Sequence, residues 1–198
     1  MCFYFQQSKD ATNLKNRFKA KYSDDKISPM GSFNGFTYPK TPVITNEKID
    51  EIELLNWGLI PNWSKDEEIR KFTLNARVET IKEKPSFRNS VNKRCLIIAD
   101  TFFEWQWLDP KGKQKQKYEI FIENKDSFVF GGLWSRWTNK ETGEIKDTYT
   151  ILTCEANKLM SEIHNSKKRM PLIIANEFEW LNGEDPILRN DNLIAEAI

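Results

Sequence analysis

The sequence predicts an α+β protein built on a curved, largely antiparallel and barrel-like β-sheet with helices at its periphery. Several strand-like segments in the second half of the chain are joined by short turn sequences, which is typical of β-hairpins. Helical patterns occur before and after this run of strands, which places helices at the edges of the sheet. No change in composition and no internal repeat divides the chain, so we expect one domain over residues 1–198.

The first expected elements are a strand and a helix. The opening residues "MCFYF" have the apolar, aromatic character of a buried strand, although a chain end is usually frayed unless it is tied down. Residues 8–22 predict a surface helix that is capped by Ser8, because Leu14 and Phe18 follow at helical spacing.

The next segments are a loop, a strand and a short helix. Residues 28–42 hold glycines and prolines among aromatic residues, which indicates an ordered loop rather than a flexible linker. Residues 53–63 predict a strand that ends at Pro61. An acidic first turn in residues 64–72 favours a short helix.

Strands dominate the second half of the chain. Alternating and continuous apolar runs predict strands at residues 94–109, 117–123, 127–137 and 147–154. Two helices are expected afterwards, in residues 155–164 and in residues 175–183, where Gly183 ends the second one.

Composition and charge place the protein among ordinary globular proteins. Hydrophobic residues make up 39% and charged residues 30%, and no apolar run approaches the ~18 residues of a membrane span. The chain does not begin with the pattern of a secretory signal, so we expect a cytoplasmic protein without a membrane partner. A net charge of +1 argues against a broad basic field but leaves a local basic groove possible.

The cysteines and the histidine argue against a metal site. Three widely spaced cysteines and one histidine form neither a disulfide framework nor a zinc-ligand pattern. Cys95 and Cys154 lie in apolar runs and are expected to be inert core residues. Cys2 lies outside such a run, and His164 gains functional interest only if it meets Cys2. We expect no metal and no cofactor.

Glu104 is a candidate acid–base group. In "TFFEWQW" it is surrounded by aromatic residues, and this apolar setting predicts a raised carboxyl pKa that suits proton transfer near neutrality. A carboxylate that pairs with an arginine at the sheet rim explains the same pattern equally well.

Asn75 and Arg77 are candidate ligands for DNA. They stand close together in "NARVET", and the planar guanidinium of arginine suits a phosphate. In isolation, the pattern also fits a helix that starts with Asn75 as its cap and carries Arg77 on its surface.

Other residues bear on nucleic-acid binding. Trp63 follows a proline in a loop and is the best candidate for an exposed ring on which an unpaired base stacks. Alternating lysines follow the turn at residue 110 and are interpreted as a solvated hairpin in preference to a DNA-binding arm: Lys111, Lys113, Lys115 and Lys117.

Taken together, these segments resemble the SOS response-associated peptidase (SRAP) family. The match runs in order from residue 2 to about residue 174, and the ordered set is far more specific than any one motif. It consists of Cys2 behind Met1, "WGLIPNW" at 57–63, "NARVET" at 75–80, "RCLIIADTFFEW" at 94–105, "GGLW" at 131–134, "TILT" at 150–153, and His164 with "RMP" at 169–171.

The resemblance implies a sensor of abasic sites in single-stranded DNA. Members of the family cross-link covalently to such sites through the N-terminal cysteine, which would protect the lesion during the DNA damage response. The resemblance also implies a monomer that is cytoplasmic and becomes nucleoid-associated on DNA. The residues implied as catalytic are Cys2, Asn75, Glu104 and His164, and those implied as DNA contacts are Arg77, Asn75, Trp63, Arg169 and Pro39.

The residue types fit this chemistry. Removal of Met1 would leave Cys2 with a free α-amine of pKa ~7.7 and a thiol of pKa ~8.5, a pair that closes an aldehyde into a thiazolidine ring through an imine. Glu104 would deprotonate the amine, and His164, with a pKa of ~6.5, would protonate the sugar ring oxygen. Arg77 would hold the phosphate beside the lesion, and Asn75 the sugar or the N-terminal backbone.

Two other functions remain open at this point. A thiol (auto)peptidase would use the Cys2 sulfur as nucleophile and His164 as base. A non-covalent reader of single-stranded or modified DNA would need the groove and Trp63 but not the thiol.

Overall fold

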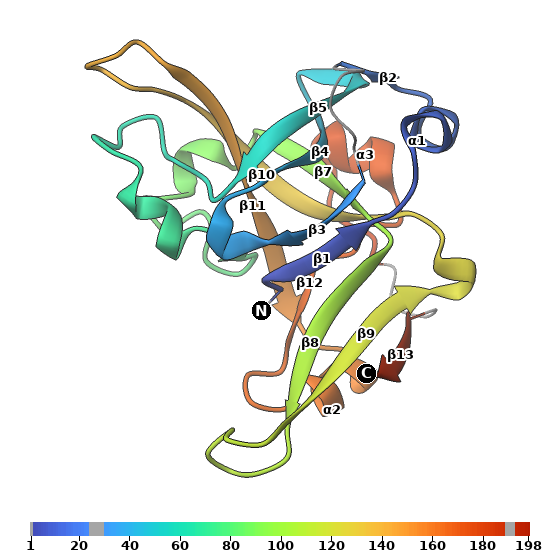
Figure 1. The fold of residues 1–198 in the computed structure, drawn as a ribbon. Helices are drawn as coiled ribbons and strands as arrows, with labels where there is room; N and C mark the ends of the chain where they lie inside the picture. Colours follow the sequence, from blue (N-terminus) through green and yellow to red (C-terminus); the bar gives the residue numbers. More distant parts are fainter. Residues whose placement is uncertain (1, 24–29, 189–192) are drawn as a thin grey trace.

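The computed structural model describes residues 2–23, 30–188 and 193–198, and its centre is a closed β-barrel (Figure 1). The barrel closes because β11 pairs in parallel with β5, whereas the other neighbouring strands run antiparallel. In the order of pairing, its strands are β11 (Ile145–Glu155), β10 (Phe128–Thr138), β7 (Arg94–Ala99), β4 (Lys40–Thr45) and β5 (Lys48–Trp57). Three short strands extend it: β2 (Lys21–Tyr22), β6 (Asn75–Arg77) and β12 (Arg169–Pro171).

A second sheet of five antiparallel strands packs against the barrel. Its order is β13 (Leu193–Ala197), β9 (Lys115–Ile122), β8 (Thr101–Trp107), β1 (Tyr4–Gln7) and β3 (Gly31–Asn34). The β8–β9 hairpin projects from the lower end of the molecule in Figure 1. The expected α+β fold on a barrel-like, largely antiparallel sheet is therefore confirmed.

The helices are short and peripheral, as expected. They are α1 (Ala11–Phe18), α2 (Lys158–Ile163) and α3 (Glu177–Leu181), together with the 3₁₀ turns η1 (Gly35–Thr37), η2 (Glu68–Phe72), η3 (Arg88–Ser90) and η4 (Glu123–Lys125). Gly183, with φ of +100°, follows α3 and ends it as expected. No helix among the described residues is both long and apolar enough to cross a membrane.

The cap of α1 differs from the expectation. Asp10, not Ser8, caps the helix, and its carboxylate accepts a hydrogen bond from the backbone N–H of Asn13. Ser8 instead donates through its backbone N–H and its hydroxyl to the buried carboxylate of Asp100. A buried carboxylate needs such donors, and this need takes Ser8 away from the helix.

Three expected elements before residue 75 were also wrong in detail. The described part of residues 28–42 is not only a loop, because it contains β3, η1 and the start of β4; residues 28 and 29 lie outside the described residues. The strand expected to end at Pro61 begins at Lys48 and ends at Trp57, where Gly58 takes a φ of +99°. The helix expected in residues 64–72 is the 3₁₀ turn η2.

The apolar run at residues 94–109 is two strands rather than one. β7 lies in the barrel and β8 lies in the second sheet, with Asp100 between them. The backbone N–H of Asp100 donates to the carbonyl of Gln6, and its carboxylate is held by Ser8. These contacts fix the crossing point between the two sheets, a feature that hydrophobic periodicity does not reveal.

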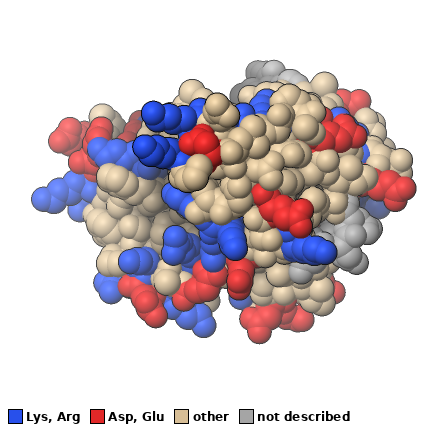
Figure 2. All heavy atoms as spheres, turned by 90° about the horizontal axis from the view of Figure 1, so that it is seen from below, with Lys and Arg blue, Asp and Glu red and all other residues tan. Residues whose placement is uncertain are grey.

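Charges of both signs are mixed on the surface. Figure 2 views the molecule from the side of the β8–β9 hairpin and shows Lys and Arg side chains interspersed with Asp and Glu, with several cationic groups toward the left and centre. This distribution agrees with the net charge of +1. Any attraction of this face for an anion is therefore local.

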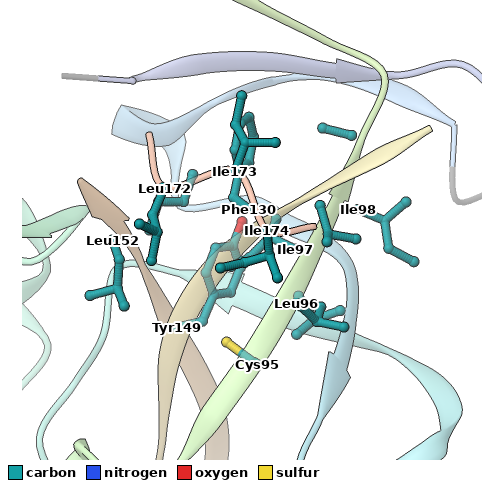
Figure 3. Packing of buried hydrophobic residues seen from close by; sticks show 14 of the residues in the cluster. Cys95, Leu96, Ile97, Ile98, Phe130, Tyr149, Leu152, Leu172, Ile173 and Ile174 are labelled. Carbon is teal, nitrogen blue, oxygen red and sulfur yellow. The ribbon is translucent and has the colours of Figure 1, made fainter. Parts of the chain in front are cut away.

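The barrel interior is filled by aliphatic and aromatic side chains (Figure 3). Trp57 stacks on Tyr149 with ring centroids 6.2 Å apart, and the Tyr149 hydroxyl bonds to the hydroxyl of Thr41 at 2.8 Å. Burial of each large apolar side chain contributes roughly 1.5–3 kcal/mol of transfer free energy. Cys95 and Cys154 are buried in this core with raised thiol pKa, which fits the inert role expected of them.

Gly132, on β10, allows close packing inside the barrel. A Cβ atom there would lie 2.5 Å from Ile97 Cδ1 and 2.6 Å from the carbonyl oxygen of Thr150. We predict that Gly132→Ala lowers the free energy of unfolding in urea by about 1–3 kcal/mol, because the Thr150 backbone has to move. Gly131→Ala is the matched control, since its Cβ would meet only side-chain ends at 3.0 Å and beyond, and its loss should be smaller. Equal losses would contradict this account.

Candidate active site at the N-terminal strand

The N-terminal strand β1 is anchored on both sides. It pairs with β3 and with β8, and the backbone N–H of Gly35 donates to the carbonyl of Phe3 at 2.9 Å. The fully buried ring of Phe5 packs against Trp57 and Phe130, with centroid distances of 5.2 and 5.7 Å. The N-terminal strand expected from "MCFYF" is confirmed in part: it spans Tyr4–Gln7 and is half buried, and Cys2 is buried in the body of the protein just before it.

Cys2 is fully buried and is held by its backbone as well as by its side chain. Its carbonyl accepts a hydrogen bond from the Asn75 side-chain amide at 2.9 Å, and its thiol donates weakly to the carbonyl of Tyr4 at 3.7 Å. Burial, together with the charge of Glu104, raises the pKa of the thiol well above the reference value used in the sequence analysis. The thiol is therefore protonated at neutral pH in this structure.

Asn75 and Arg77 lie on a strand, so the alternative of a helix capped by Asn75 is wrong. β6 pairs in parallel with β11, which places Ala76 in the core. Side chains alternate along a strand, so Asn75 and Arg77 share the opposite face. Asn75 points toward Cys2, and Arg77 is exposed two residues further along.

Glu104 and His164 meet in the interior. Glu104 is 4% exposed and His164 7% exposed, and Glu104 Oε2 lies 4.0 Å from His164 Nε2. Burial raises the pKa of the Glu104 carboxyl to about 7, as the apolar setting in the sequence predicted. Near neutral pH this carboxyl is divided between its protonated and ionised forms, which lets it both accept and donate a proton.

The protonation of His164 differs from the expectation. Burial lowers the pKa of its imidazole to about 4, so it is neutral at pH 7 rather than half protonated. Its Nδ1 lies 2.7 Å from the carbonyl oxygen of Arg169 and 3.4 Å from the backbone nitrogen of the same residue, and the shorter contact, to a carbonyl that can only accept, assigns the proton to Nδ1. Nε2 is then an acceptor, and it faces Glu104.

Arg169 approaches the site through its backbone, while its side chain is paired elsewhere. The guanidinium forms a two-pronged ion pair with Glu79, at 2.6 and 2.9 Å, and also donates to the carbonyl of Thr153 at 2.6 Å. A DNA phosphate at Arg169 would compete with Glu79. Sequence reasoning missed this role of Glu79, although its place in "NARVET" was the available signal.

Trp63 and Pro39 lie outside the Cys2 cluster. The Trp63 ring is 48% exposed, as expected, and its indole N–H donates to the carbonyl of Pro85 at 3.3 Å. Pro39 follows η1 and accepts a hydrogen bond from the backbone of Trp57. Their predicted DNA contacts stay predictions, but the segment before Pro39 contacts Phe3, the residue that precedes β1, through the backbone of Gly35. Within the described ranges, no group of three or more His, Cys, Asp or Glu side chains is placed to hold a metal ion.

The buried carboxyl of Glu104 makes stability depend on pH. Its pKa is raised in the folded protein, so its contribution to stability is fully present below about pH 4.5 and is lost as pH rises toward 7. We predict that Glu104→Gln gains stability relative to the parent protein between pH 4.5 and pH 8, by on the order of 3 kcal/mol. His164 is present in both proteins, so its own pH-dependent contribution cancels in the difference between their stabilities. Urea unfolding at several pH values measures the difference, and an offset that is constant with pH would contradict the raised pKa.

Comparison with known proteins identifies the family of this chain. The family model "SOS response associated peptidase (SRAP)" matches residues 1–196. The abasic site processing protein YoqW of Bacillus subtilis is 41% identical over 174 residues, covering 83% of this chain and 75% of YoqW. The abasic site processing protein HMCES of Gallus gallus is 33% identical over 170 residues, which cover 72% of this chain and 49% of HMCES.

A solved structure agrees with the sequence comparisons. A crystal structure of a protein from Bacteroides thetaiotaomicron superimposes with a TM-score of 0.89 at 34% identity, covering 100% of this chain and 92% of that one. The family match spans nearly the whole chain and includes β1, β6, β8 and the segment that carries His164. The chain therefore belongs to the SOS response-associated peptidase (SRAP) family.

Proposed function

We propose that this protein processes abasic sites in single-stranded DNA by forming a covalent cross-link through Cys2. The observation that carries the proposal is the placement of Cys2, the second residue of the chain, just before the anchored strand β1, beside Asn75 and close enough to Glu104 for that charge to affect its thiol. The names of the relatives YoqW and HMCES support abasic-site DNA as the substrate class.

The α-amine of Cys2 acts first in this proposal. It is free only after removal of Met1, a residue that lies outside the described part of the chain. The amine nitrogen attacks the aldehyde carbon of the ring-opened sugar, and the carbinolamine loses water to form an imine. The Cys2 sulfur then adds to the same carbon while the thiol proton passes to the imine nitrogen, which closes a thiazolidine ring. Water is the only leaving group, and no oxidant is needed.

Glu104 is the proton carrier best suited to these steps. With a carboxyl pKa of about 7, it accepts a proton from the α-ammonium and returns one to the departing hydroxyl group. His164, neutral and protonated on Nδ1, turns its unprotonated Nε2 toward Glu104 at 4.0 Å. Glu104 therefore supplies the proton to the sugar ring oxygen and takes up the proton that the C1 hydroxyl loses as the aldehyde forms, in place of the imidazolium suggested by the sequence.

Asn75 and Arg77 hold the two reactants. The Asn75 amide fixes the carbonyl of Cys2, and this restricts the direction of the amine and the thiol. Arg77 lies on the same face of β6 and is exposed, so its guanidinium is available to a phosphate beside the lesion.

The burial of the site disfavours the thiol peptidase alternative. A peptidase of that kind needs a thiolate paired with an imidazolium. Here the Cys2 thiol has a raised pKa and the His164 imidazole a lowered one, so the stable arrangement keeps the proton on sulfur. An amine that attacks first does not need a thiolate. The gel experiment below distinguishes a non-covalent reader of DNA from a protein that forms a covalent cross-link.

We predict that the purified protein without Met1 forms a heat-stable band with an abasic single-stranded oligonucleotide on a denaturing gel. Cys2→Ala should lose the stable band, because the ring cannot close without sulfur. Cys2→Ser keeps the amine and should give an adduct that is trapped by borohydride as the reduced imine. Intact mass of the free protein verifies removal of Met1.

Two outcomes would contradict the proposal. If correctly trimmed protein binds the oligonucleotide without any covalent band, the protein is a non-covalent reader. If Cys2→Ala forms the same heat-stable band, another residue is the nucleophile. Cys154→Ala is the matched control, since Cys154 is buried in the core and should not affect the band.

A further inference from the structure

The outer face of the β8–β9 hairpin carries aromatic and cationic side chains in register. Phe103, Trp105 and Trp107 alternate with the inward-facing residues of β8. Trp105 and Trp107 lie opposite Lys117 and Lys115 of β9, whereas Phe103 lies opposite Glu119, whose carboxylate pairs with Lys125. We call this set of five residues, Phe103, Trp105, Trp107, Lys115 and Lys117, the aromatic–lysine ladder. Its inner neighbour Glu104 belongs to the site described above, so the two faces of one strand differ in chemistry.

The lysines of the ladder are close to rings but not to carboxylates. Lys117 Nζ lies 4.3 Å from the centroid of Phe103, and Lys115 Nζ lies 5.6 Å from that of Trp107. In the part of the chain that the structure describes, neither ammonium group has an acidic partner within ion-pair distance. Several other lysines do have one: Lys48, Lys71, Lys93, Lys125 and Lys146.

The ladder is held in place by contacts on its other side. The backbone N–H and carbonyl of Trp107 both bond to the side chain of Asn165, and Gln106 donates to the carbonyl of Glu162 at the end of α2. The Trp107 ring lies so close to Gly112 that a Cβ there would be 2.5 Å from it. The rings are therefore positioned before any ligand arrives, which lowers the entropic cost of binding.

A cavity connects the ladder to the N-terminal strand. Its volume is about 420 Å³, and Tyr4, Asn34, Phe103, Trp105 and Lys117 are among the residues that line it. The Tyr4 and Trp105 rings are 5.2 Å apart. Tyr4 lies two residues from Cys2 in the sequence, so the cavity adjoins the segment that carries Cys2.

We propose that the aromatic–lysine ladder binds the single-stranded DNA that flanks the lesion, with unpaired bases on its rings and phosphates at Lys115 and Lys117. Aromatic faces interleaved with unpaired cations match the bases and the backbone of single-stranded DNA, and duplex DNA lacks the exposed base faces. The proposal rests on the proposed function for the position of the lesion at Cys2. It replaces the interpretation of these lysines as a merely solvated hairpin, because the structure places two of them over aromatic rings.

Fluorescence anisotropy with a non-reactive abasic analogue tests the ladder without the covalent step. The probes are labelled oligonucleotides that carry one tetrahydrofuran residue, with a long flank on the 5′ side or on the 3′ side. We expect Trp107→Leu to weaken binding of one of the two probes by about tenfold, the loss typical of one stacked base. We expect the double variant Lys115→Gln/Lys117→Gln to lower the salt slope of log K by about 1.4, at ~0.7 for each phosphate contact.

Lys93→Gln is the matched control, since Lys93 Nζ lies 4.5 Å from the ring of Trp134 next to the barrel strand β7 and should leave both probes unaffected. Wild-type affinity and salt slope for both probes in the lysine double variant would overturn the ladder, even if Trp107→Leu were to disturb folding. Gel cross-linking by the parent protein separates the two proposals. If the parent protein cross-links but the ladder variants bind DNA as tightly as it does, only the ladder is rejected. If the ladder variants bind more weakly but the parent protein does not cross-link, only the covalent chemistry is rejected.

Discussion

The anchoring of the first strand is the constraint on which the proposed site depends. β1 is hydrogen-bonded to β3 and β8, and Phe5 inserts its ring among the aromatic side chains of the barrel. A nucleophile at a free chain end would sample many orientations. Holding it in one orientation accounts for much of the higher reaction rate of a bound reactant compared with a free one. Here the strand pairing and Phe5 restrict Cys2, and the Asn75 amide holds its carbonyl.

Burial is the second determinant of the site, because it favours the uncharged form of all three titratable groups. It raises the pKa of the Cys2 thiol and of the Glu104 carboxyl, and it lowers the pKa of the His164 imidazole. Each shift favours the uncharged form, as expected for polar groups enclosed by apolar residues. A site of this kind is poorly suited to a thiolate–imidazolium pair and better suited to an amine whose proton is exchanged with a carboxyl of near-neutral pKa.

In the two proposals, strand β8 contributes through both of its faces. Alternation places Glu104 inside, near His164, and Trp105 and Trp107 outside, opposite the lysines of β9. The position of a single strand then sets the geometry of the reacting groups and of the surface beside them. The cavity lined by Tyr4 and Trp105 lies between the outer face of β8 and the N-terminal strand β1.

The sequence by itself determined the architecture and named most of the members of the candidate site. Turn-linked apolar runs predicted the antiparallel barrel-like sheet, and the aromatic residues around Glu104 predicted its raised pKa, because both depend on local pattern. Only the tertiary structure decided that Asp100 divides one apolar run between two sheets, that His164 is neutral, and that Arg169 pairs with Glu79. These features depend on burial and on contacts between residues far apart in the chain, such as the 90 positions between Glu79 and Arg169, and periodicity does not encode them.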